Sequence, residues 1–106
     1  MKYSELIQIL NDCAAKCTHC ADACLDEQDI KKMVRCIRLD RICAATCEAT
    51  AKILAANSAG EDAQGLVKFC REICEKCADE CEKHEMKHCQ DCADACRECA
   101  AACSAF

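Results

Sequence analysis

The cysteines are the residues of this chain whose type and spacing can do chemistry, and they make up sixteen of its 106 residues. Within several segments, consecutive cysteines are separated alternately by three and four positions, which is typical of a stripe along one face of a helix. Asp40 also stands at a stripe position, between two cysteines. Because thiolates are soft ligands that select Cu(I), zinc or iron–sulfur clusters, the stripes predict a metal-binding interior. The predicted metal ligands are Cys13, Cys17, Cys20, Cys24, Cys36, Cys43, Cys47, Cys70, Cys74, Cys77, Cys81, Cys89, Cys92, Cys96, Cys99 and Cys103.

The residues around the cysteines predict the helices that must position them. Ala, Lys, Glu, Asp and Arg fill the positions between the stripes, proline is absent, and glycine occurs twice. Breaks are expected in the acidic segment 26–29, at the C-cap signal 57–60, and near 82–87, where the phase of the stripe jumps. We therefore expect helices over about 3–25, 30–57, 61–83 and 86–104. Short connections make neighbouring helices antiparallel. The predicted fold is thus all-α, an up-down-up-down four-helix bundle with a cysteine-lined core, in a single metal-storage domain over residues 1–106.

This arrangement predicts two chemically different ends of the bundle. The end that carries His84 and His88 is called the histidine end below, and it is expected to hold Cys24, Met33, Cys36, Cys81, Met86 and Cys89 as well. At the opposite end, called the leucine end, the stripes continue as Leu6, Leu10, Leu54, and Leu66 or Val67, with Phe106 nearby. The candidate ligands for arriving metal, or supports of those ligands, are Met33, Asp40, His84, Met86 and His88. The alternative is that the two histidines are ordinary surface residues at a helix junction and that Met33 only packs.

Composition and charge limit the classes of partner. The net charge is −5, and no basic patch with interleaved aromatic residues exists, so no nucleic-acid partner is expected. No apolar run approaches the roughly 18 residues that a membrane span needs, so no membrane partner is expected. The first ten residues lack the apolar region of a signal peptide, which predicts a cytoplasmic location. In that reducing compartment, cysteines serve more often as metal ligands than as disulfides.

Charge balance favours Cu(I) among the thiophilic metals. A zinc ion bound by four thiolates carries a net double negative charge, and a stack of such sites would place a prohibitive charge in a core whose stripes offer no lysine or arginine. One Cu(I) for each bridging thiolate gives a neutral core instead. The sequence therefore predicts a protein that holds many Cu(I) ions, on the order of a dozen or more.

Several other functions compete with this interpretation. The first is a metallothionein-like zinc buffer, and the second is a thiol redox protein that cycles disulfides. Cysteines used only as core filler and disulfide-stapled hairpins are further structural alternatives. The segment from His84 to His88 matches the H-E-x-x-H signature of zinc proteases and contains the E-x-x-H element of di-iron bundles. Neither enzyme class fits a short chain whose core positions are cysteines, so a non-enzymatic protein is predicted.

The motifs as a whole resemble a known family. Over essentially its whole length, the chain resembles the cytosolic four-helix-bundle copper storage proteins of bacteria. The resemblance is carried by three motifs: Cys13-x-x-x-Cys17-x-His19-Cys20-x-x-x-Cys24-Leu25, Cys36-Ile37-Arg38-Leu39-Asp40-Arg41-x-Cys43-x-x-x-Cys47, and Lys83-His84-x-x-x-His88-Cys89-Gln90-x-Cys92-x-x-x-Cys96.

The resemblance implies a homotetramer of bundles that fill their cores with Cu(I) through thiolates. It also implies loading through an end with histidine and methionine residues, and a small copper chaperone is a plausible donor or acceptor. Asp40 belongs to the family pattern, and we expect it to orient a neighbour or to pair with an arginine. Leu6, Leu10 and Val67 stand where some members continue with cysteine, which implies a shorter copper column and a deeper hydrocarbon plug.

Overall fold

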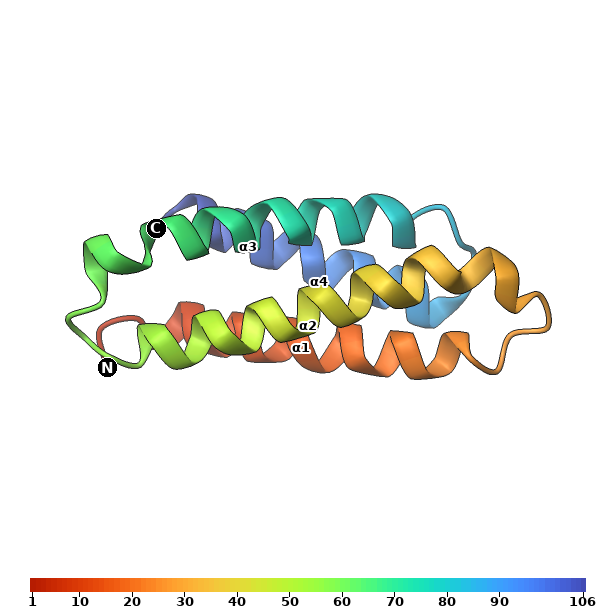
Figure 1. Cartoon of the computed structure of the whole chain (residues 1–106), viewed down its shortest axis with the longest axis horizontal. Coiled ribbons are helices and arrows are strands. Elements are labelled where there is room, and N and C mark those ends of the chain that lie inside the picture. Colours follow the sequence, from red (N-terminus) through yellow and green to blue (C-terminus); the bar gives the residue numbers. More distant parts are fainter.

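Four long helices and no strand make up the fold in the computed structural model, which describes residues 1–106. The helices are α1 (Ser4–Cys24), α2 (Val34–Leu54), α3 (Gly60–Cys81) and α4 (Lys87–Ser104), and a short 3-10 turn, η1 (Ile30–Met33), precedes α2. Figure 1 shows consecutive helices running in opposite directions, with both chain termini at one end of an elongated molecule. Each helix packs against two neighbours: α1 and α3 each contact both α2 and α4. The predicted all-α four-helix bundle is therefore confirmed.

The connections set the ends of the helices. The helix expected over 30–57 begins as the 3-10 turn η1, continues as α2 from Val34, and ends at Leu54. Gly60, expected as a C-cap, is instead the first residue of α3 and has a φ of 22°, a backbone conformation that favours glycine. Asn57 accepts a hydrogen bond of 3.1 Å from the backbone nitrogen of Lys2, which ties the N-terminus to the α2–α3 connection.

The α3–α4 connection contains neither glycine nor proline, and backbone geometry and side-chain bonds hold it, among them a bond from Gln90 and the ion pair of Glu82 with Arg97 in α4. Met86 adopts an extended conformation directly before α4. The side-chain amide of Gln90 in α4 donates to the backbone oxygen of His84 at 2.6 Å. This bond holds the connection against the first turn of α4. The α3–α4 connection and the α1–η1 connection lie at the same end of the bundle (Figure 1).

Cysteine supplies half of the apolar core. All sixteen cysteines are reduced and buried, none with more than 5% of its surface exposed, and they belong to a single cluster of 32 buried residues. Alanines occupy most of the remaining positions on the inward faces, for example Ala14, Ala44, Ala78 and Ala93. Because a protonated thiol packs as a small hydrophobic group, such a core can drive folding without metal. No helix of the structure is long and apolar enough to span a membrane.

Candidate metal centre

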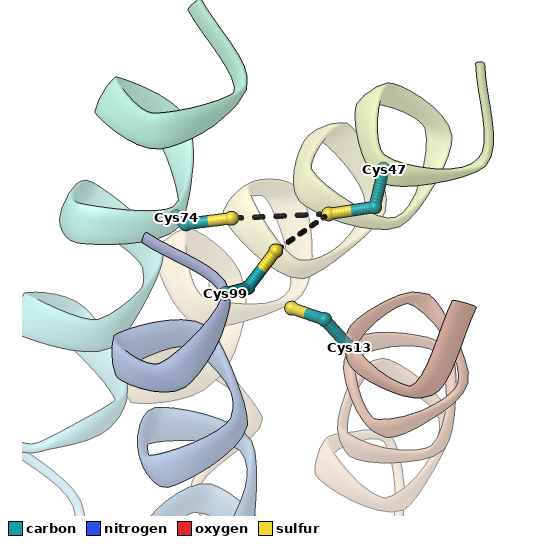
Figure 2. Close-up of side chains that lie close together, drawn as sticks. All are labelled: Cys13, Cys47, Cys74 and Cys99. Carbon is teal, nitrogen blue, oxygen red and sulfur yellow. Dashed lines mark hydrogen bonds between the residues drawn. The ribbon is translucent and has the colours of Figure 1, made fainter. Parts of the chain in front are cut away.

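The thiols converge on the bundle axis from all four helices. Figure 2 shows one such layer, in which Cys13 of α1, Cys47 of α2, Cys74 of α3 and Cys99 of α4 direct their sulfur atoms at a common point. The Sγ atom of Cys47 lies 3.8 Å from that of Cys74 and 4.0 Å from that of Cys99 (Figure 2). Two metal–sulfur bonds of about 2.3 Å each can bridge a sulfur–sulfur gap of this size. The sulfur atoms of the layer are thus spaced so that they can bind an ion without movement of the backbone.

Neighbouring layers share ligands, so the sites form a continuous column. Four groups of buried ligand atoms, each within 4.8 Å of one another, follow the layer of Figure 2 toward the histidine end. Cross-helix sulfur–sulfur distances remain short along the column, at 3.6 Å for Cys43–Cys74 and for Cys36–Cys81. An ion bound in one layer therefore changes the ligands available to the next. The groups are Cys13, Cys17, Cys43 and Cys96; Cys17, Cys77, Cys92 and Cys96; Cys20, Cys24, Cys36 and Cys89; and Cys20, Cys36, Asp40 and Cys81.

Asp40 is the only carboxylate inside the column. It is fully buried, and its Oδ1 accepts hydrogen bonds from the thiols of Cys77 at 3.1 Å, Cys92 at 3.3 Å and Cys81 at 3.5 Å. Asp40 therefore contacts thiols and forms no ion pair with an arginine, which was one of the two expectations for this residue. Burial, followed by the negative charge of nearby sulfurs, raises the pKa of Asp40 to about 8. The carboxyl group is thus largely protonated near neutral pH while the thiols remain metal-free.

Burial keeps two thiols at the histidine end, Cys24 and Cys89, protonated, whereas hydrogen bonds from Cys20 and Cys81 lower the pKa of the neighbouring Cys36 to about 3. The pKa of Cys24 is raised chiefly because its thiolate would be poorly solvated, and the same cause raises the pKa of Cys89 to about 12. Cys24 and Cys89 are therefore uncharged in the metal-free protein. A metal ion that binds here must displace protons from the sulfurs it contacts.

The two predicted histidines close this end of the column. The Nδ1 atom of His88 lies 3.4 Å from Cys20 Sγ and 3.5 Å from Cys89 Sγ, while its Nε2 atom lies 3.0 Å from a carboxylate oxygen of Glu27. The Nε2 atom of His84 lies 2.9 Å from Glu80. With side chains only 12% and 14% exposed, these histidines are not ordinary surface residues.

A cavity of about 330 Å³ opens beside His84. Its lining includes the soft sulfur of Met33 and Met86, the imidazole of His84, and the carboxylate of Glu27. Met33 is 1% exposed and Met86 is half-buried, so both methionines face the protein as well as the cavity. Three of the residues expected at this end, Met33, His84 and Met86, are therefore brought together around one opening.

Sequence reasoning did not single out Glu27 and Glu80. Glu80 is in the last turn of α3 and stands four positions before His84 in the sequence, so an i, i+4 pair was available as a signal. Glu27 follows α1 and meets His88 across 61 positions of sequence, a contact that no local pattern indicates.

The leucine end is closed by hydrocarbon, as its sequence suggests. Leu10, Leu54 and Val67 are buried across the end of the thiol column, whereas Leu6 and Leu66 are only half-buried. Phe106 packs its ring against Tyr3, with centroids 5.3 Å apart, over the outside of this end. Of the two residues considered for the α3 stripe, Val67 is therefore the buried one.

The protease-like and di-iron-like motifs do not have the local structure that those sites need. Both require their ligands on one continuous helix. Here α3 ends at Cys81 and α4 begins at Lys87, so His84 lies in the connection and His88 in the next helix. The segment from His84 to His88 therefore matches these motifs in sequence only, and in the structure it forms a helix junction.

A four-helix bundle with a buried column of reduced thiols defines the class of helical, thiol-based metal-binding proteins. Comparison with known proteins narrows this class, because a sequence model described as copper storage protein matches residues 1–106. The chain belongs to the copper storage protein family.

Individual relatives agree with this assignment. An uncharacterized cysteine-rich protein of Bacillus subtilis, YhjQ, is 41% identical over 103 residues, which cover 96% of this chain and 94% of the relative. The cytosolic copper storage protein of Streptomyces lividans, solved with five coppers, matches with a TM-score of 0.92 and 39% identity over 98% of this chain and 90% of the other. The Cu(I)-bound copper storage protein BsCsp3 matches with a TM-score of 0.91 and 37% identity over 99% and 97% of the two chains.

Proposed function

We propose that this protein stores and sequesters Cu(I), holding many ions on the thiolates of its core. The observation that carries the proposal is the column of sixteen buried, reduced cysteines whose ligand groups overlap from layer to layer. The relatives solved with bound copper support the choice of metal. Such a column keeps free copper low and away from the thiols of other proteins.

The charge of the core supports Cu(I) over zinc. The buried polar or charged residues are Asp40, Thr50 and Glu80, so no buried lysine or arginine is present to balance negative charge. Several zinc tetrathiolate sites would leave this interior strongly anionic, which costs far more than a neutral arrangement. Monovalent copper shared between thiolates avoids that cost because each ion cancels the charge of one sulfur.

The burial of the thiols also separates storage from redox catalysis. A disulfide-cycling protein needs a low-pKa thiol that its substrate can reach. Here the most exposed cysteine, Cys103, is 5% exposed, and its pKa is raised because neighbouring Cys70 and Cys99 interact with it and burial disfavours the thiolate. We therefore propose a non-enzymatic role.

The proposed metal ligands are the sixteen cysteines, with copper arriving at the histidine end. The cavity beside Met33, His84 and Met86 offers soft and imidazole ligands outside the column, and His88 offers its Nδ1 atom next to the first thiols. Asp40 lies further in, among the thiols of α2, α3 and α4. These residues form a graded path from solvent to the storage layers.

Location and assembly complete the proposal. The Streptomyces relative is described as cytosolic, which supports a cytoplasmic protein that exchanges copper with a small chaperone. Exposed apolar side chains, among them Leu25, Val34 and Ile42, support a homotetramer that would bury them. Light scattering coupled to gel filtration measures the assembly, and a monomer at micromolar concentration would contradict it.

The decisive experiment is an anaerobic titration of the reduced, metal-free protein with Cu(I) against a chelator, followed by far-UV circular dichroism. We expect roughly one tightly held copper for each cysteine and an unchanged helical signal, because the bundle is already folded. Saturation at four or fewer ions, or folding only when metal is added, would favour the zinc alternative.

A triple variant localises the copper in the same titration. Replacing Cys43, Cys74 and Cys96 by serine removes soft ligands from three helices at the middle of the column. The copper capacity should fall by about three ions or more, because layers share ligands. Ala45→Ser on the exposed face of α2 is the matched control. An unchanged capacity in the triple variant would show that the core is not the storage site.

A further inference from the structure

The two ring nitrogens of His88 face chemically opposite partners. Nδ1 points at the thiols, 3.4 Å from Cys20 Sγ and 3.5 Å from Cys89 Sγ. Nε2 points outward and lies 3.0 Å from Oε2 of Glu27. The ring is mostly buried, with 14% of its side chain exposed, and Glu27 is 29% exposed. The imidazole thus spans the boundary between the thiol column and the solvent side of the bundle.

This arrangement selects one tautomer of the neutral imidazole. A carboxylate accepts hydrogen bonds and donates none, so the Nε2 atom beside Glu27 must carry the hydrogen. The lone pair of the neutral ring then resides on Nδ1, directed at the two sulfurs. The opposite tautomer would set the Nε2 lone pair against the carboxylate oxygen. In metal sites, a carboxylate behind a histidine fixes the ring in this manner and makes it a better ligand.

Glu27 is held in place by the end of α1. It lies in the connection between α1 and η1, and its backbone nitrogen donates to the oxygen of Cys24 at 3.2 Å. Its only side-chain hydrogen bond is the one with His88. The carboxylate is therefore anchored to the same helical turn that supplies Cys24 to the first thiol group.

The second carboxylate–histidine pair at this end differs in two respects. Glu80 divides its oxygens among His84, Lys83 at 3.4 Å and Arg35 at 3.6 Å. His84 also makes no hydrogen bond to a thiol, whereas His88 lies against two. The pairing of a dedicated carboxylate with a ring that touches metal-binding sulfurs is specific to Glu27 and His88.

We propose that Glu27 is a positioning residue for copper loading: it holds His88 as the Nε2–H tautomer, with the Nδ1 lone pair beside Cys20 and Cys89. A Cu(I) ion that arrives at the histidine end then meets a nitrogen ligand and two sulfurs in one place. This inference rests on the proposed copper storage function and assigns Glu27 a role in the rate of filling, not in the capacity.

The tautomer is measured directly by long-range ¹⁵N–¹H NMR of histidine-labelled, metal-free protein. The wild type should show His88 protonated at Nε2. In Glu27→Ala the Nδ1–H tautomer should gain population, because the carboxylate acceptor that selects Nε2–H is then lost. Glu27→Gln should restore the wild-type pattern, since its amide oxygen accepts the same hydrogen bond. An Nε2–H tautomer that persists unchanged in Glu27→Ala would overturn the proposal.

Stopped-flow transfer of Cu(I) from a chelate to the full-length protein measures the consequence. Glu27→Ala should slow the first phase about tenfold, the lower range for loss of a residue that supports a metal ligand, and leave the final copper number unchanged. Glu85→Ala is the matched control, because it removes one exposed negative charge from the same end. If Glu85→Ala slows loading equally, Glu27 acts only by attracting cations and the proposal fails.

A double variant tests whether Glu27 acts through His88. In a His88→Ala background, Glu27→Ala should slow loading no further, whereas an additional tenfold effect would contradict the inference. The experiments also distinguish a failure of the proposed copper storage from a failure of the proposed role of Glu27. A wild type that saturates at four or fewer ions refutes copper storage, while normal capacity with equal rates in wild type and Glu27→Ala refutes only the role of Glu27.

Discussion

At the scale of single residues, Asp40 has the least common environment in the molecule. Its carboxyl group is fully buried and surrounded by thiols, with no cation nearby to stabilise its ionised form. This explains why its pKa rises to about 8 although four thiols donate hydrogen bonds to it. Asp40 thus costs stability when it ionises.

Asp40→Asn should change how the stability of the metal-free protein depends on pH. The folded pKa lies above the ordinary value of 3.8, so the folded state binds the proton more tightly than the unfolded state does. The protonated Asp40 carboxyl therefore contributes its full share to the free energy of unfolding below pH 4. This contribution is lost as the pH rises toward 8, by at most about 1.4 kcal/mol per pH unit.

Urea unfolding at several pH values between 4 and 8 measures that slope. The asparagine still accepts thiol hydrogen bonds but does not ionise, so the decline should flatten in the variant. An equally steep decline in Asp40→Asn would assign the pH dependence to other groups.

At the scale of the helices, one stripe serves two purposes. Each helix presents cysteines to the axis along most of its length, while α1, α2 and α3 continue the stripe with Leu10, Leu54 and Val67 at the leucine end. Protonated thiols and hydrocarbon side chains pack alike. One straight helix can therefore carry metal-binding cysteines along most of its length and apolar residues that close the bundle at its end. The end of the copper column is therefore set by side chains alone.

Leu54→Ala should separate stability from copper capacity. Leu54 is completely buried at the end of α2, so its truncation leaves a cavity and should cost about 2–5 kcal/mol of unfolding free energy. The number of Cu(I) ions bound should not change, since no cysteine is lost. Chemical denaturation and copper titration measure the two effects, with Ile53→Ala, at a site that is 44% exposed, as the control. A loss of copper in proportion to stability would show that the plug and the column are not independent.

At the scale of the whole molecule, copper loading is an exchange of protons for metal inside a prefolded vessel. Cys24 and Cys89 at the histidine end are protonated in the metal-free protein, because burial raises their pKa values. Each sulfur that becomes a ligand releases its proton to solvent. A neutral column thereby remains close to neutral as it fills with a monovalent ion.

Copper affinity should consequently fall in acid. Between pH 8 and pH 6, the apparent affinity for Cu(I) should decrease by up to about tenfold per pH unit for each proton released on binding. Competition with a chelator, corrected for the chelator's own protonation, provides the measurement. An affinity that is independent of pH over this interval would mean that the sulfurs are already thiolates before copper arrives.

The order of the residues determined the fold and most of the candidate site. A period of three and four along four segments fixes the inward face of each helix, because side chains so spaced lie on one side of an α-helix. The same rule placed Asp40 among the cysteines and gathered the histidines and methionines at one end. Chain connections short enough to force antiparallel neighbours then left one arrangement, the bundle seen in Figure 1.

Only the tertiary structure decided which groups face one another across helices. The carboxylate of Glu27 reaches His88 over 61 positions, and the thiols rather than an arginine surround Asp40. The tautomer of His88 and the pKa of Asp40 both follow from these contacts. Helical periodicity fixes the direction in which a side chain leaves the axis of its own helix. The partner that the side chain meets depends on how the neighbouring helix is shifted along the bundle and rotated, and packing sets both.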